Sequence, residues 1–180
     1  VSRLNDSPRR VRWVRMRPMQ PTPCTHPDAV IEAPFGVLAL RTRDERLTGI
    51  DFLPPGQPLK PPMTALARRV ALQLAAYFQD PTTVFDLPLE PDGTPYRQRV
   101  WQAIRAIGCG GTRTYGELAA MLGSTPRAVG QAVGDNPLPI IVPCHRVVGK
   151  HGLGGFAHAV DGYAIEIKRW LLRHEGALGR

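Results

Sequence analysis

Cys144, His145 and Arg146 have the clearest chemical potential in this sequence, within the segment NPLPIIVPCHRVV at residues 136–148. A thiolate becomes a strong nucleophile when a neighbouring base or positive charge lowers the pKa of its thiol. His145 is the candidate base. His145 could take the proton directly or through one water molecule. Because adjacent side chains of an extended strand point to opposite faces, we favour the relay through water. An imidazole in this role also needs a carboxylate to orient it, which spacing alone does not identify.

The alternative interpretation is that Cys144 is structural, because free cysteine is most often a small buried side chain. Pro143 removes a backbone donor just before it, which predicts that Cys144 stands at the end of a strand and not within a sheet. His145 and Arg146 do not suit a sealed core without partners. These neighbours favour a functional cysteine.

Two short helices are predicted immediately before this segment. Thr114 and Glu117 are spaced as the capping box of the first helix, which ends at Gly123. Thr125-Pro126 begins the second helix. The positions predicted to be buried are Leu118, Met121, Leu122, Ala128, Val129, Ala132 and Val133. Two short helices around a glycine turn match a helix-turn-helix.

Two longer helices are predicted on either side of this pair. The first has Thr94-Pro95 as its cap and first residue and ends before Gly108. The last covers residues 163–174 and is followed by Gly176. Their predicted inward residues are Tyr96, Val100, Ile104, Ile107, Ile167, Trp170 and Leu171.

The first half of the chain is predicted to be rich in strands. GVLAL (36–40) and LTGIDFL (47–53) predict two strands joined by a polar turn, and FDLPLE (85–90) predicts one more. Apolar residues recur every four positions over residues 66–78, which indicates an amphipathic helix. The predicted fold class is therefore α+β.

These patterns divide the chain into three parts. Residues 1–27 are rich in Arg and Pro without apolar periodicity and predict a flexible basic arm. We expect a small α+β domain over 28–91 and a mostly helical domain over 92–180. No apolar run approaches the roughly 20 residues of a membrane span, so we expect a soluble protein without a membrane partner.

Cysteine use and charge limit the compartment and the partners. Three widely spaced cysteines, and no apolar block of a secretory signal, favour a reducing, cytoplasmic location. Cys24 and His26 are poorly spaced for zinc and lack a second pair, so no metal site is predicted. The net charge is +8, with eleven basic against five acidic residues over 97–180, and this favours nucleic acid as a partner.

The motif PCHRV, at residues 143–147, resembles the active-site signature of the O6-alkylguanine-DNA alkyltransferases, or methylated-DNA–protein-cysteine methyltransferases. FDLPL, GTPYRQRVWQAI, TYGELA, RAVG, DNP and KRWLLRHEG follow the family order over most of residues 30–176. The resemblance implies a ribonuclease H-like domain before a DNA-binding, alkyl-acceptor domain. It implies irreversible transfer of an alkyl group from O6-alkylguanine, and from O4-alkylthymine, to the protein's own cysteine, with base flipping and a single turnover.

The resemblance implies a chemical role for each matching residue. Cys144 is similar to the alkyl acceptor, and His145, with a bound water and Glu175, is similar to the proton relay. Asn136 resembles a hinge that bonds backbone groups and joins the helix pair to the cysteine segment. Arg146 resembles a structural tether. No cofactor is implied, because the lesion is itself the alkyl donor.

The resemblance also implies how DNA is bound. Tyr115 resembles a residue that contacts the flipped nucleotide and its phosphate, and Arg127 one that fills the gap in the base stack. Ala128 and Ala132 would allow a close approach to the minor groove. The remaining implied base- or DNA-binding residues are Thr114, Val148, Phe156 and Ala157. The implied partner is double-stranded DNA containing O6-alkylguanine. The protein is expected to bind it as a monomer, and cooperative binding along the DNA is left open. In a bacterium it would be associated with the nucleoid.

The sequence departs from the family pattern after the signature. Gly155-Phe156-Ala157 stands where a glycine-tyrosine-serine or glycine-tyrosine-alanine triplet is usual, and the extra residues HAVDGYA (158–164) follow. Phe156 would still provide an apolar wall, or Tyr163 would replace it in a different register. The alternatives to an alkyltransferase are a lesion-binding protein without catalysis and a DNA-binding regulator. A cysteine hydrolase fits less well, because no oxyanion-hole element is identifiable.

Overall fold

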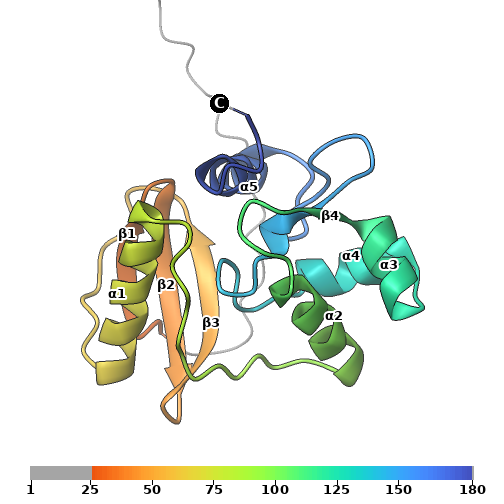
Figure 1. Cartoon of the computed structure of the whole chain (residues 1–180). Helices are drawn as coiled ribbons and strands as arrows, with labels where there is room; N and C mark the ends of the chain where they lie inside the picture. Colours follow the sequence, from red (N-terminus) through yellow and green to blue (C-terminus); the bar gives the residue numbers. More distant parts are fainter. Residues whose placement is uncertain (1–25, 180) are drawn as a thin grey trace, which may run out of the picture.

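The computed structural model describes residues 26–179, which begin with an antiparallel sheet (Figure 1). Its strands are β1 (Ala29–Ala33), β2 (Gly36–Arg43) and β3 (Arg46–Leu53), in the order β1-β2-β3. The two strands predicted on either side of the polar turn are confirmed as β2 and β3, and β1 is an additional edge strand. All but two of the predicted arm residues 1–27 lie outside the described residues, as does Cys24.

One long helix, α1 (Ala65–Gln79), packs against this sheet, as predicted (Figure 1). Thr64 caps it, because its side chain accepts a hydrogen bond from the backbone N–H of Ala67. Its buried residues are Ala67, Val70, Leu74 and Tyr77. Tyr77 is 1% exposed, and the spacing of apolar residues had not selected it.

The prediction of a strand over residues 85–90 is wrong. This segment is irregular and forms only one isolated bridge, between Leu47 and Leu89. The backbone N–H of Leu47 donates to the carbonyl of Pro88, and that of Glu90 donates to the carbonyl of Leu47. Pro88 has no N–H to extend a ladder, and the N–H of Asp86 donates to the side chain of Gln73.

The second half is helical, as predicted, with α2 (Pro95–Arg105), α3 (Tyr115–Leu122), α4 (Pro126–Gly134) and α5 (Gly162–His174). Two short strands, β4 (Arg113–Thr114) and β5 (Val147–Val148), pair in parallel. The capping box of Thr114 and Glu117 is confirmed, as is the end of α3 at Gly123, where φ is +61°. The prediction that Met121 is buried is wrong, since it is 66% exposed and Ala119 lies inward instead.

The cysteine segment does not form the predicted strand. Residues 138–142 make a buried turn in which the N–H of Val142 donates to the carbonyl of Leu138 at 2.8 Å. Ile140 has a φ of +74°, and the prolines of this segment cannot donate to a ladder. Cys144 is instead the first residue of a short 3-10 helix, η1 (Cys144–Arg146).

The sheet, α1 and the helical half contribute to one continuous apolar core. Between the halves, the N–H of Ile50 in β3 donates to the carbonyl of Pro137 at 2.9 Å. The result is a mixed α/β fold, a small antiparallel sheet with helices. The boundary near residue 91, the ribonuclease H-like topology and the DNA-binding role of the α3–α4 pair stay predictions. No helix within residues 26–179 is long and apolar enough to cross a membrane.

Candidate active site

Cys144 lies at the start of η1 and is only 4% exposed. Burial raises the pKa of its thiol to about 11, although the side chain of Asn136 and the charge of Lys168 act in the opposite direction. The sequence-based expectation that its surroundings lower the pKa of this thiol does not hold for the resting protein. The neutral thiol must therefore lose its proton to a base when it reacts.

His145 is placed to be that base. It is fully buried, and its Nε2 lies 2.8 Å from Oε1 of Glu175. Burial lowers the pKa of the imidazole despite the opposing effect of the carboxylate. Nδ1 is buried without a hydrogen-bond partner among the described residues. With the proton on Nε2 directed at the carboxylate, Nδ1 presents a lone pair that can accept a proton.

The carboxylate of Glu175 is held by four hydrogen bonds from three side chains. Arg146 donates from Nε to Oε2 at 2.8 Å and from Nη2 to Oε1 at 2.9 Å, and Tyr77 donates to Oε1 at 2.8 Å. The fourth bond is to His145. Burial acts to raise the pKa of Glu175, but these bonds outweigh it and keep that pKa below its usual value. The carboxylate is therefore ionised at neutral pH.

Arg146 also ties this site to the end of α2, since its Nη1 donates to the carbonyl of Ile107. Asn136 holds the cysteine segment from the other side. Its Nδ2 donates to the carbonyl of Val142 at 2.8 Å, and its Oδ1 accepts from the N–H of Leu138 at 3.0 Å. These bonds join the residues after α4 to the turn that precedes Cys144.

Lys168 is a site residue that the sequence analysis missed. It is fully buried, and its Nζ donates to the carbonyls of Val147 at 2.6 Å and Gly155 at 2.9 Å. Burial lowers the pKa of Lys168 to about 8, against the opposing effect of Cys144. The charged residue inside an otherwise apolar stripe of α5 was the signal that could have found it.

Tyr115 is half-buried and close enough to Cys144 for the two groups to interact electrostatically. Its hydroxyl donates to the carbonyl of Gly155 at 3.0 Å, and Nζ of Lys168 lies 5.9 Å from the centre of its ring. Burial, and secondly the nearness of Cys144, raises the pKa of Tyr115 to about 12. A side chain at Gly154 would collide with the ring of Tyr115, with 2.9 Å between the added carbon and Cε2.

The loop after β5 contains Phe156 and Ala157. Phe156 is 3% exposed and packs on Phe52 of β3, with 5.6 Å between ring centroids. Tyr163 faces the N-terminal sheet, where its hydroxyl lies 2.8 and 2.9 Å from the carbonyl oxygens of Phe35 and Leu53 and shares its one proton between them. The alternative register, in which Tyr163 replaces Phe156 as the wall, is therefore wrong.

The remaining predicted residues lie on the surface elements around this centre. Thr114 caps α3, Val148 is half-buried in β5, and Arg127 is exposed at the second position of α4. Ala128 is half-buried, but Ala132 is 2% exposed and its carbonyl accepts from the indole of Trp101. Ala132 therefore cannot provide the expected small surface, because it faces the core.

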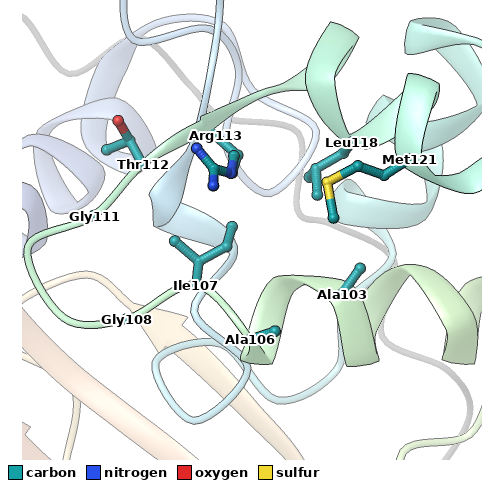
Figure 2. Close-up of a pocket in the computed structure, with 9 residues that line it drawn as sticks. All are labelled: Ala103, Ala106, Ile107, Gly108, Gly111, Thr112, Arg113, Leu118 and Met121. Carbon is teal, nitrogen blue, oxygen red and sulfur yellow. The ribbon is translucent and has the colours of Figure 1, made fainter.

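A surface cleft of about 220 Å³ lies elsewhere, between the end of α2, the loop that follows it and α3 (Figure 2). Its lining residues are Ala103, Ala106, Ile107, Gly108, Gly111, Thr112, Arg113, Leu118 and Met121. None of them was predicted to bind the base or to act on it. Cys144 is not among the residues that line it, although Ile107 also bonds Arg146 through its carbonyl.

Most of the chain is similar to known proteins of one family. The family model for the DNA-binding domain of 6-O-methylguanine DNA methyltransferase matches residues 95–177. A methylated-DNA–protein-cysteine methyltransferase of Methanosarcina acetivorans is 39% identical over 157 residues, which are 83% of this chain and 97% of that protein. The protein of that name from Salmonella typhimurium is 50% identical over 111 residues, which are 59% of this chain and 61% of that protein.

Solved structures show the same fold. The Mycobacterium tuberculosis O6-methylguanine methyltransferase superposes with a TM-score of 0.67 at 37% identity, covering 84% of this chain and 93% of that one. Mycobacterium tuberculosis OGT in complex with DNA gives a TM-score of 0.68 at 38% identity, covering 82% of this chain and 91% of that one.

Proposed function

The chain belongs to the methylated-DNA–protein-cysteine methyltransferase family, and we propose that it repairs DNA by moving an alkyl group from O6 of guanine to Sγ of Cys144. The observation that carries the proposal is the buried hydrogen bond between Glu175 and His145, the residue that directly follows Cys144 in the sequence. This bond leaves Nδ1 of His145 as a proton acceptor. The other cysteine of the described residues, Cys109, is exposed and lies in a loop.

In the proposed reaction, the thiol proton passes to Nδ1 of His145 through one water molecule. Sγ of Cys144 attacks the alkyl carbon, a C–S bond forms, and the bond between that carbon and O6 breaks. The departing guanine anion takes up a proton from water, and the imidazolium of His145 returns its proton to water. Thiol and alkylguanine thus become thioether and guanine. A thioether has no proton to lose, so each molecule acts once. The lesion is the donor, and no cofactor enters the balance.

Glu175 and Lys168 support this transfer electrostatically. The ionised carboxylate stabilises the imidazolium that forms on His145, and Arg146 and Tyr77 hold it in place. The buried charge of Lys168 acts to lower the pKa of the thiol. Its largest effect is expected when the sulfur carries negative charge, because an electrostatic interaction is stronger in a dry site than in water.

DNA is the proposed partner, in the duplex form with one modified base. An O6-alkyl group inside the base stack cannot be approached in line by a buried sulfur, so the base has to be flipped out at a cost of a few kcal/mol. We assign Arg127 to the gap left in the stack, Tyr115 to the flipped nucleotide and its phosphate, and Ala128 and Thr114 to the nearby DNA surface. The exposed position of Arg127 at the start of α4 supports this assignment.

The pocket for the extruded base is assigned to Val148, Phe156 and Ala157, beside Tyr115. The same thiol chemistry extends to O4-alkylthymine, which carries its alkyl group on an equivalent exocyclic oxygen. Phosphate contacts carry no sequence information, so binding is expected to weaken strongly with salt. We propose a monomer acting in the cytoplasm, at the nucleoid in a bacterium.

The test is to incubate the protein with a duplex carrying one O6-methylguanine and to digest it for mass spectrometry. The expected result is one added methyl group on the peptide that contains Cys144, with a stoichiometry that does not exceed one per molecule. Cys144→Ala should abolish transfer and keep DNA binding. Methyl transfer to Cys24 or Cys109 would refute the acceptor assignment, and binding without any transfer would indicate a lesion-binding protein instead.

A further inference from the structure

Tyr77 connects the N-terminal half of the chain to the proton relay. It lies in α1, which packs on the sheet, yet its hydroxyl donates to Oε1 of Glu175 across a separation of 98 residues. Its backbone is tied to the same place, because its carbonyl lies 2.7 Å from Nε2 of His174. Both ends of this residue therefore meet the C-terminal end of α5.

Packing of the ring does not explain why residue 77 carries a hydroxyl. The Tyr77 ring is almost fully buried and lies against His174 and Phe85, with centroid distances of 5.3 and 5.6 Å. A phenylalanine would fill the same space. A buried hydroxyl needs a hydrogen-bond partner to offset its desolvation, and here the partner is the carboxylate that orients His145.

Oε1 of Glu175 accepts from three donors, namely Tyr77, His145 and Arg146. Each additional donor withdraws electron density from the oxygen and weakens its attraction for the imidazolium of His145. The third donor also restricts where the carboxylate can turn. Tyr77 thus acts on both the position of the His145 ring and the basicity of its Nδ1.

We propose that Tyr77 is a positioning residue of the His145–Glu175 relay, through which the N-terminal half of the chain sets the proton affinity of His145 and the rate of transfer to Cys144. The effect on the transfer rate rests on the proposed function, whereas the effect on the proton affinity of His145 does not. The other ionisable groups around the relay are Arg146 and Cys144 from η1, Lys168 and His174 from α5, and Cys109 from the loop after α2.

The first experiment compares Tyr77→Phe with the unchanged protein. Loss of one donor leaves a more basic carboxylate, so the pKa of His145, measured by NMR of the labelled ring nitrogens, should rise by about 0.5 to 1. Loss of this donor also lets the carboxylate turn, so the His145 ring is held less well beside Cys144. We expect this loss of position to outweigh the gain in basicity. The rate constant of methyl transfer from a saturating duplex should therefore fall about tenfold at neutral pH, with an unchanged Kd for the duplex.

Tyr163→Phe is the matched control. Tyr163 also has a hydroxyl that joins α5 to the N-terminal half, but it donates to the carbonyls of Phe35 and Leu53 and not to the relay. It should change thermal stability by a similar amount and leave the pKa of His145 unchanged. In a Glu175→Gln background, Tyr77→Phe should cause little further loss of rate, because its route of action has been removed.

The outcomes separate the two proposals. An unchanged pKa of His145 in Tyr77→Phe, or an equal change in Tyr163→Phe, would show that Tyr77 is only a packing residue. If the unchanged protein places no methyl group on Cys144, the proposed function fails. The titration of His145 then still decides whether Tyr77 acts on the relay.

Discussion

At the scale of single residues, the structure combines a protonated thiol with a base that is ready to accept its proton. Burial raises the pKa of Cys144 and lowers that of His145, so both groups are neutral in the resting protein. A neutral thiol reacts poorly with stray electrophiles. The ionised Glu175 supplies the charge that stabilises the transfer once a substrate is in place.

A substitution of Lys168 tests the effect of its buried charge on Cys144. Lys168→Met removes the buried charge that acts to lower the pKa of Cys144. It also removes the Lys168 hydrogen bonds to the carbonyls of Val147 and Gly155, of which Gly155 keeps the bond from Tyr115. We expect transfer to slow by about tenfold or more, and the pKa of Cys144, followed by the pH dependence of its alkylation with iodoacetamide, to rise. The protein should also lose about 1–3 kcal/mol of stability.

Lys150→Met is the control, because Lys150 is exposed in the turn after β5. This substitution also removes one positive charge, but from an exposed position. It should leave the pH dependence of Cys144 alkylation unchanged. An equal effect of both substitutions would show that the total charge matters and not the buried position of Lys168.

At the scale of elements, the caps of α3 and α4 define the surface that meets DNA in the proposed function. The capping box of Thr114 begins α3 beside Tyr115, and Gly123 turns the chain into α4 with Arg127 at its exposed start. Asn136 then links the end of this pair to the cysteine turn. A shift in the position of α4 would therefore reach Cys144 through the hydrogen bonds between the Asn136 side chain and the backbone of this turn.

Arg127→Ala provides the prediction for this pair. If Arg127 fills the gap in the stack, the substitution should slow repair of O6-methylguanine in a duplex about 10- to 100-fold, because the open base stack costs a few kcal/mol. Attack on the free modified base, measured by mass spectrometry of the Cys144 peptide, should change little.

Arg68→Ala controls for the loss of one positive charge. Arg68 is exposed on α1, which Figure 1 shows on the far side of the molecule from α3 and α4. It should leave both rates nearly unchanged. Equal losses on duplex and free base with Arg127→Ala would mean that Arg127 takes no part in flipping.

At the scale of the whole molecule, one carboxylate connects three separate parts of the chain. Glu175 ends α5 and binds Tyr77 of α1 together with His145 and Arg146 of η1. The surrounding core is continuous between the sheet and the helices. Loss of the Glu175 carboxylate should therefore weaken the contact between the two halves of the chain and also disrupt the proton relay.

The pH dependence of stability tests this connection. The pKa of Glu175 lies below its ordinary value of 4.5 in the folded protein, so the unfolded chain binds more protons in acid. The stabilisation is complete above about pH 4.5 and is lost as the pH falls towards the folded pKa. Denaturant unfolding should show a lower stability at pH 4 than at pH 6.

Glu175→Gln should be about 3 kcal/mol less stable at pH 6, because it leaves Arg146 and its partners without a counter-charge. It should also lose less stability between pH 6 and pH 4. Glu166→Gln, on the exposed side of the same helix, should keep the original slope. A Glu175→Gln variant with the unchanged slope would argue against an ionised carboxylate in the folded state.

Local sequence by itself determined the helices, their caps and the chemical identity of the site. Thr94, Thr114 and Thr125 each cap the helix predicted for them, because a capping bond joins residues three apart. The PCHRV motif and the motifs around it indicated the family that the comparisons then showed. These signals lie within short stretches, so they do not depend on how distant segments meet.

Only the tertiary structure decided how the distant side chains converge. Tyr77 reaches Glu175 over 98 residues, and Lys168 turns into the core to bond the carbonyls of Val147 in β5 and Gly155 in the loop after it. Burial also reversed the expected direction for the pKa of Cys144. The turn at Ile140 replaced a strand because the prolines left no ladder to join. Desolvation and long-range hydrogen bonds depend on the packed molecule, and a local sequence pattern does not contain them.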